Sequence, residues 1–63
     1  MKLVRLTEAY TNRPVAINPA NVAMLMPVAS TDGPHKTTIY INNTTIVVLG
    51  QYDEVAHKIE AQL

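Results

Sequence analysis

Apolar and polar residues alternate along two short segments near the start of the chain. Val4 and Leu6 share one face of residues 2–8, which is the pattern of a half-buried β-strand. Pro14 can begin a second strand but cannot sit within a central one, because proline has no N–H to donate to the sheet. That second strand carries two apolar residues on one face, Val15 and Ile17. The pattern therefore predicts two strands that each turn one face toward a core.

Residues 22–28 predict a third strand that is apolar on both faces. Strict alternation divides its side chains into two sets, Val22, Met24, Met26 and Val28 on one face and Ala23 and Leu25 on the other. Pro27 confines the segment to a sheet edge, a bulge or a strand end. Methionine fills irregular core gaps and is also common at adaptable binding faces. The segment can therefore fill the core or form a subunit interface, and its pattern leaves both open.

Turn-forming residues separate these segments. At residues 18–21, Asn18 is expected to accept a hydrogen bond from a backbone amide beyond Pro19, while the proline fixes φ for one helical turn. Residues 30–36 predict a loop, because serine, threonine, aspartate, glycine and proline follow one another there.

A hairpin is predicted next in the chain. Residues 37–41 and 44–49 are rich in β-branched side chains, which favour strands. Asn42 and Asn43 lie between them and suit a tight two-residue turn, because asparagine tolerates a positive φ better than most residues. Gly50 is expected to end the second strand.

From Gln51 onward the apolar period changes from two to about 3.6 residues, which predicts a helix that starts near Tyr52 and runs to the end of the chain. Asp53 and Glu54 fall in its first turn, where the helix dipole favours negative charge. Gln51 is a poor N-cap. The apolar stripe of this helix contains Tyr52, Val55, Ala56, Ile59 and Leu63.

These elements predict one domain over residues 1–63, of the α+β class and mostly β. We expect an antiparallel meander of four to five short strands, arranged as one sheet, with a single C-terminal helix across one face. The helix stripe is expected to cover a core built from five strand residues, Val4, Leu6, Ile17, Ile39 and Val48.

Composition points to self-association. Apolar residues make up 48% of the chain and charged residues 16%, against about 25% charged residues in ordinary globular domains. A core of this size rarely supplies more than roughly 3–5 kcal/mol, and the chain has no cysteine for a disulfide. We therefore expect a homo-oligomer, most simply a two-fold dimer, joined at a sheet edge or through a predicted interface of Met24, Leu25, Met26 and Val28. Another protein is a further expected partner.

Candidate chemistry is sparse. His35 lies in the predicted loop with Asp32, which could orient it as a base, and His57 lies on the helix four residues after Asp53. Neither histidine has the spacing of a metal motif. The chain also lacks a glycine-rich phosphate loop and a nucleophile motif. We therefore predict no enzymatic activity, no cofactor and no metal.

Nucleic acid and membranes are also poor matches. The formal net charge is zero, so no global field draws the chain to a polyanion. A local basic strip of Lys2, Arg5 and Arg13 is the alternative, and it predicts only weak, salt-sensitive binding to RNA or DNA. No apolar run is long enough to span a bilayer, and the first residues lack the apolar region of a signal peptide, which predicts the cytoplasm.

The order of these signals resembles the FlbD-type flagellar and swarming motility proteins and similar short phage and bacterial proteins. The resemblance rests on KLVRL at residues 2–6, AINPANV at 16–22, TIYINN at 38–43 and IVVLGQYDEV at 46–55. It implies a small accessory or regulatory module without catalytic activity. A second resemblance is to the carbon-storage regulators, which are small β-rich RNA-binding dimers with a C-terminal helix. Residues 46–52 lack the basic side chain that this second family places before its helix.

The sequence thus predicts a non-catalytic protein-interaction module of bacterial or phage origin that acts as a homo-oligomer. The alternative is a small RNA- or DNA-binding regulator that uses the basic strip.

Overall fold

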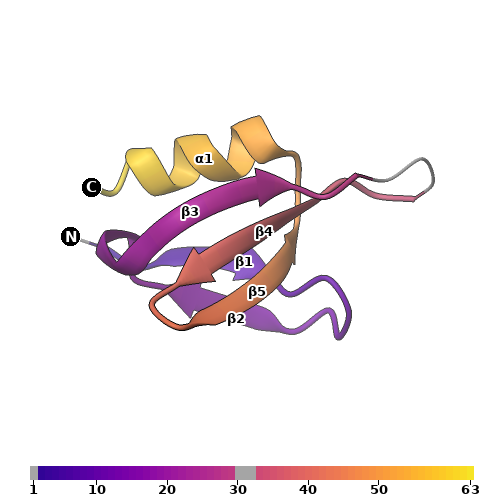
Figure 1. Cartoon of the computed structure of the whole chain (residues 1–63), viewed down its shortest axis with the longest axis horizontal. Helices are drawn as coiled ribbons and strands as arrows, with labels where there is room; N and C mark the ends of the chain where they lie inside the picture. The colour runs from indigo at the N-terminus through magenta and orange to yellow at the C-terminus, as the bar shows by residue number, and fades with distance from the viewer. Residues whose placement is uncertain (1, 30–32) are drawn as a thin grey trace.

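The structure, a computed structural model, describes residues 2–29 and 33–63. It contains seven elements in chain order: β1 (Val4–Thr7), β2 (Pro14–Ile17), the 3-10 helix η1 (Pro19–Asn21), β3 (Val22–Pro27), β4 (Lys36–Ile41), β5 (Thr44–Leu49) and α1 (Tyr52–Glu60). The predicted class is confirmed, since the strands are short and antiparallel and one helix follows them. Figure 1 shows β3, β4 and β5 in front of β1 and β2, with α1 running beside β3.

β1 and β2 form a hairpin with the predicted inward faces. Val4 lies opposite Ile17, and Leu6 lies opposite Val15. Directly opposite residues share a face of a sheet, so these four side chains point the same way. Val4, Leu6 and Ile17 are buried, and Val15 packs against them.

The turn after β2 follows the predicted chemistry. Asn18 caps η1, and its side-chain Oδ1 accepts a hydrogen bond from the backbone N–H of Ala20 at 3.0 Å. Pro19 supplies the first helical position and is itself buried. This single turn redirects the chain from β2 into β3.

The second sheet has the order β3-β4-β5, which places β3 at its edge and Pro27 at the end of that edge strand. A two-residue turn joins β4 to β5, with Ile41 opposite Thr44. Asn42 adopts φ 52°, the positive value that the Asn42-Asn43 pair predicts.

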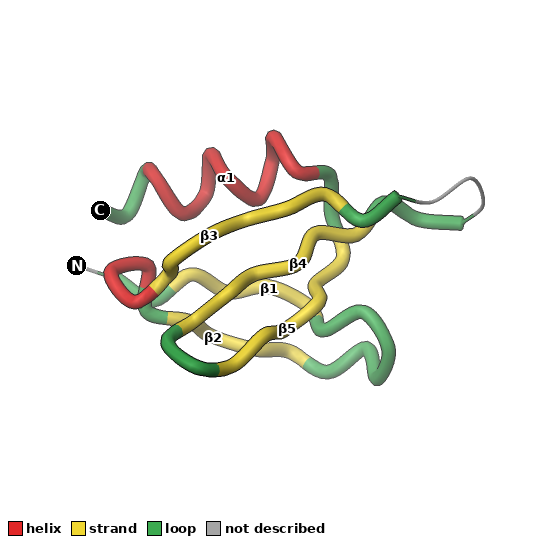
Figure 2. The backbone as a smooth tube through the Cα atoms, in the orientation of Figure 1, coloured by secondary structure: helices red, strands yellow, loops and turns green. Residues whose placement is uncertain are grey.

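The five strands do not form one continuous sheet, and the single-sheet expectation is corrected here. β2 and β3 do not pair, because η1 carries the chain from one layer to the other. The two sheets meet instead on the β1–β5 side (Figure 2), through a bridge between Glu8 and Val48 and a hydrogen bond of 2.9 Å from Ala9 N–H to the Val47 carbonyl.

α1 completes a core between the layers. Val55 and Ile59 are buried with all five strand residues that the sequence predicts for the core: Val4, Leu6, Ile17, Ile39 and Val48. Ala56 is half-buried. The ends of the stripe differ from the prediction, because Tyr52 is 40% exposed and Leu63 is 72% exposed. Tyr52 is the first residue of the helix and lies one turn before Val55, the first buried one. Leu63 lies beyond the end of α1 at Glu60 and therefore does not continue the helical stripe.

Candidate functional site

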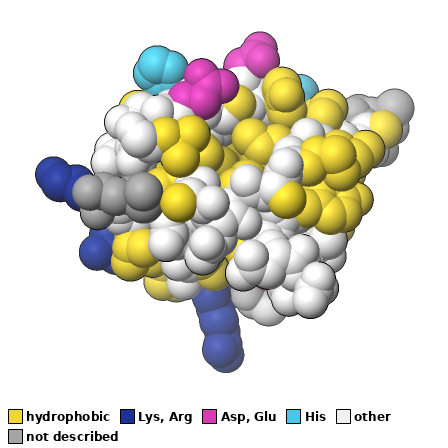
Figure 3. All heavy atoms as spheres, turned by 60° about the vertical axis from the view of Figure 1, so that its left-hand side comes forward, with side chains coloured by type: hydrophobic (Ala, Val, Ile, Leu, Met, Phe, Trp, Pro, Cys, Tyr) yellow, Lys and Arg dark blue, Asp and Glu magenta, His cyan; other side chains and the backbone are white. Residues whose placement is uncertain are grey.

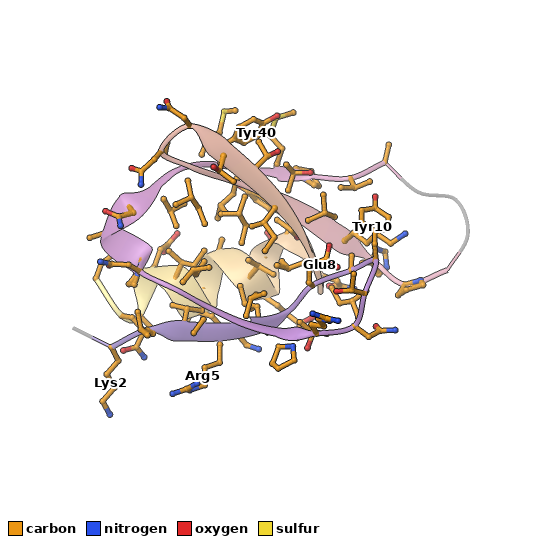
Figure 4. All side chains as sticks on the ribbon, turned by 90° about the horizontal axis from the view of Figure 1, so that it is seen from below. Lys2, Arg5, Glu8, Tyr10 and Tyr40 are labelled. Atoms are coloured by element: carbon orange, nitrogen blue, oxygen red, sulfur yellow. The ribbon has the colours of Figure 1, made fainter. Side chains whose placement is uncertain are left out.

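Two cross-strand rows form the outer face of the β3-β4-β5 sheet. One row contains Met24, Tyr40 and Thr45, and the other contains Met26, Thr38 and Val47. None of these six side chains is charged, and the next pair in register, Lys36 opposite Leu49, lies on the same face of the sheet and adds one positive charge at its end. The six uncharged side chains lie on the surface opposite the core residue Ile39, and we call them the outer face. Tyr40 projects away from the body of the fold in Figure 4, on the side away from β1.

The exposed apolar part of the outer face comes mainly from β3. Met24 is 47% exposed and Met26 is 45% exposed. Exposed methionines among the uncharged side chains of a sheet face are typical of adaptable contact surfaces. The face is therefore available for contact with an apolar partner.

A β-bulge changes which side chains belong to this face. The register shifts between Val22 and Met24, so that Ala23 is an extra residue and Val22 no longer shares a face with the methionines. Val22 and Leu25 both pack against the core. The alternation predicted for Val22 is therefore wrong.

The predicted interface residues accordingly do not share one face. Met24 and Met26 lie on the outer face, whereas Leu25 points to the core. Val28 is half-buried just after β3, where its N–H donates to the Lys36 carbonyl at 3.1 Å.

Tyr10 and Lys36 lie near one end of the outer face, and sequence reasoning missed this pair. The Lys36 ammonium is 5.4 Å from the centroid of the Tyr10 ring, a cation–π distance. Tyr10 is 69% exposed and belongs to the β1–β2 loop. The pair depends on the bridge between β1 and β5, and no local sequence pattern contains that pairing.

The β1–β2 loop is organised by the Glu8 carboxylate. Its Oε1 accepts hydrogen bonds from the Thr11 N–H at 2.6 Å, the Thr11 hydroxyl at 2.8 Å and the Tyr10 N–H at 2.8 Å. Hydrogen bonds to a carboxylate favour its ionised form. The backbone N–H of Thr11, followed by the Thr11 hydroxyl and the Tyr10 N–H, therefore lowers the pKa of Glu8 below its ordinary value of 4.5.

This lowered pKa predicts that the loop stabilises the fold only while Glu8 is ionised. A folded-state pKa below the unfolded value stabilises the protein above the unfolded pKa, and the contribution is lost as pH falls through the folded pKa. We expect Glu8→Gln to lower the melting temperature near neutral pH, with the difference from the parent disappearing once the pH falls below the folded-state pKa of Glu8. Thermal melts followed by circular dichroism test this, with the exposed Glu60→Gln as control. A deficit of Glu8→Gln that is equal at neutral and acid pH would show that the carboxylate charge does not hold the loop.

The residues of the predicted basic strip do not stay together. Lys2, Arg5 and Arg13 are all exposed. Lys2 and Arg5 project from the same side of the molecule in Figure 4. Arg5 lies opposite Ala16, three residues from Arg13, so their backbones are separated by about 10 Å along the strand. The strip is therefore reduced to Lys2 and Arg5.

Arg5 instead lines a shallow surface hollow of about 360 Å³ with residues of α1 and the turn after it. The hollow lies between the start of β1 and the end of α1 and is lined by Leu3, Val4, Arg5, His57, Lys58, Ala61 and Gln62. Figure 3 turns this end of the molecule forward and shows Lys and Arg side chains at its left and lower edges, and acidic side chains at the top beside a histidine. The sequence shows Asp53 and Glu54 in the first turn of the helix, but no local pattern indicates that His57 and Lys58 line the same hollow as Arg5.

Only His35 of the predicted catalytic pair, His35 and Asp32, lies among the described residues. His35 is exposed, and its carbonyl accepts the Gly50 N–H at 2.9 Å. Asp32, its predicted orienter, lies outside the described residues. Residues 2–29 and 33–63 hold no group of three or more His, Cys, Asp or Glu side chains placed to bind a metal ion.

Within the described part of the chain, no helix has the length and apolar character that a membrane crossing requires.

No family model, curated protein or solved structure matches the chain. The resemblance to the FlbD-type motility proteins therefore stays a prediction from the sequence.

Proposed function

We propose that this protein is a small non-catalytic interaction module, of bacterial or phage origin, that acts in the cytoplasm as a homodimer through its outer face. The observation that carries the proposal is the pair of exposed methionines among the uncharged side chains of the outer face. A two-fold axis brings the same face of two copies together. The charged residue Lys36 lies one row beyond the six uncharged side chains of the outer face, so two copies can meet through these six without like charges in contact.

The fold favours this face over a sheet edge as the contact surface. One edge of the three-stranded sheet is β3, and α1 runs beside it (Figure 1). The other edge is β5, which is bridged to the end of β1. Natural sheets commonly protect their edges in this way. Pairing through either edge would have to displace one of these neighbours, whereas the outer face has none to displace among the described elements.

The size of the outer face determines how tight a dimer we expect. Its two rows span about 14 by 13 Å, from a strand spacing near 4.8 Å and a rise near 3.3 Å per residue. A standard stable interface buries roughly 800 Å² per partner, which is several times more. The dimer is therefore expected to be weak and to depend on concentration, and another protein with a matching apolar surface would compete for the same face.

Replacing both methionines with serine tests the proposal. We expect the mass of the parent to rise toward that of a dimer as its concentration is raised from the micromolar into the millimolar range, and Met24→Ser with Met26→Ser to remain a monomer with an unchanged helix signal. Light scattering after size exclusion measures the mass, and circular dichroism checks the fold. Leu63→Ser is the control, because it removes an even more exposed apolar side chain outside the outer face. A parent that stays monomeric, or a double variant that still dimerises, would contradict the proposed face.

Nucleic-acid binding is the second candidate function. The observation that favours it is that Lys2 and Arg5 project from the same side of the molecule (Figure 4). Two neighbouring cations release few counterions, so this surface supports only weak binding that falls with salt. The exposed tyrosine Tyr10 belongs to the far loop of the β1–β2 hairpin and gives this basic side no base-stacking platform.

A further inference from the structure

The hollow between β1 and α1 has the side chains of an anion site. Three of its seven lining residues are basic, and none is acidic: the basic ones are Arg5, His57 and Lys58. Gln62 adds an amide donor. The acidic residues of the helix, Asp53, Glu54 and Glu60, do not line it. Although the whole chain is neutral, the lining of this hollow therefore carries net positive charge, with Asp53 and Glu54 one helical turn before His57 and Lys58.

We propose that this hollow binds a small phosphate monoester. Arg5 and Lys58 supply two permanent positive charges, which match the charge of −1.5 to −2 that a phosphate monoester carries near neutral pH. A carboxylate carries a single negative charge and would leave one of the two cations uncompensated. The guanidinium of Arg5 can hold two phosphate oxygens in its planar fork, and Lys58 acts as a point charge.

The remaining lining suits the body of such a ligand. Leu3, Val4 and Ala61 give the hollow an apolar side. Its volume of about 360 Å³ lies near the lower end of small-molecule sites, which run from roughly 300 to 1,000 Å³. This is room for a phosphate and a compact organic group. Because the basic side chains are exposed, we expect weak affinity in the millimolar range.

The C-terminal end of a helix is unfavourable to an anion, but here the positive charges of Arg5 and Lys58 outweigh this effect. A helix C-terminus carries the equivalent of about half a negative charge. Three carbonyls of the last turn are already occupied, since His57, Ile59 and Glu60 accept hydrogen bonds from the N–H groups of Ala61, Gln62 and Leu63. Two full positive charges therefore exceed the residual dipole.

This proposal shares no residue with the outer face and does not rest on the proposed dimer. Its test is a titration of ¹⁵N-labelled protein with phenyl phosphate at about pH 7.5, where the monoester is doubly charged. We expect saturating shifts of the amides that line the hollow and much smaller shifts with benzoate, which has the same ring and one charge. Inorganic phosphate should bind at the same amides but more weakly, because it lacks the apolar body.

Two variants separate a specific site from general charge. Arg5→Gln is expected to weaken phenyl phosphate binding roughly tenfold, as is usual when a hydrogen-bonded charge is removed. Arg13→Gln makes the same change of charge outside the hollow and should leave the affinity unchanged. Both residues are exposed, so both variants are expected to fold. Equal effects of the two variants, or shifts without saturation, would overturn the proposal.

A final titration distinguishes binding of a free phosphate ester from binding of a polynucleotide. A short single-stranded oligonucleotide is titrated with and without a 5′-phosphate, at low and physiological salt. A footprint limited to the hollow and dependent on the 5′-phosphate supports the monoester site. Tighter binding without the 5′-phosphate, with shifts that include Lys2 and Arg13, would overturn it and assign this surface to nucleic-acid backbone.

Discussion

Ile59→Asp is expected to unfold the protein. Ile59 is 4% exposed and lies in the core cluster together with residues of β1, β2, β4 and β5. The substitution removes a core side chain, which typically costs about 2–5 kcal/mol, and also buries a carboxylate that has no partner there. A core of this size supplies roughly 3–5 kcal/mol in total, so the loss equals or exceeds the stability of the fold.

The measurement is the helical circular dichroism signal during urea and thermal unfolding. Leu63→Asp makes the same change four residues later at a position that is 72% exposed, and it should melt within a few degrees of the parent. Ile59→Ala provides an intermediate step, with a loss of about 2–5 kcal/mol and no buried charge. An Ile59→Asp variant that melts like the parent would show that α1 does not pack on the sheets as described.

The parts of the fold that the sequence predicts are those encoded by neighbouring residues. The turn at Asn18 is an example, because the amide acceptor and the proline that fixes φ are adjacent in the chain. The alternation of Val4 and Leu6 similarly identifies the inward face of β1 from two residues. Such features depend on local geometry and do not require a choice among distant partners.

The division into two sheets could not be predicted in the same way. The apolar patterns of the strands fit β2 beside β3 as well as β1 beside β5. The choice depends on the direction in which η1 releases the chain and on the bridge between Glu8 and Val48. The bulge at Ala23 is equally hidden, because a run of apolar residues reads the same with or without an extra residue.

The division into two sheets and the bulge at Ala23 explain why the sequence reveals the candidate sites only in part. Met24 and Met26 are recognisable as an unusual apolar pair, but the bulge decides that they face outward and that Leu25 does not share their face. The hollow requires β1 and the end of α1 to meet, although more than fifty residues separate Arg5 from Lys58. Net charge conceals this cluster, since acidic residues elsewhere on α1 balance it.

A single methyl group added at Gly50 is expected to destabilise the fold strongly, although less than Ile59→Asp does. Gly50 joins β5 to α1 with φ 128°, a backbone conformation that residues with a side chain rarely adopt. Its N–H donates to the His35 carbonyl at 2.9 Å, and its carbonyl accepts the hydroxyl of the buried Thr37 at 3.0 Å. These bonds fix the backbone at both sides of the residue. A Cβ at this position would lie 3.2 Å from Cγ2 of Val55, which is buried in the core.

Gly50→Ala is therefore expected to destabilise the protein by about 3 kcal/mol, through backbone strain of roughly 1–3 kcal/mol and overpacking of a similar size. Gly33→Ala is the matched control. Gly33 also has a positive φ, 79°, but a Cβ there meets nothing within 4 Å, so we expect only the backbone term of about 1 kcal/mol. Urea unfolding of both variants gives the difference. Equal losses would show that Val55 does not press against the strand end, and that α1 enters its packing position from another direction.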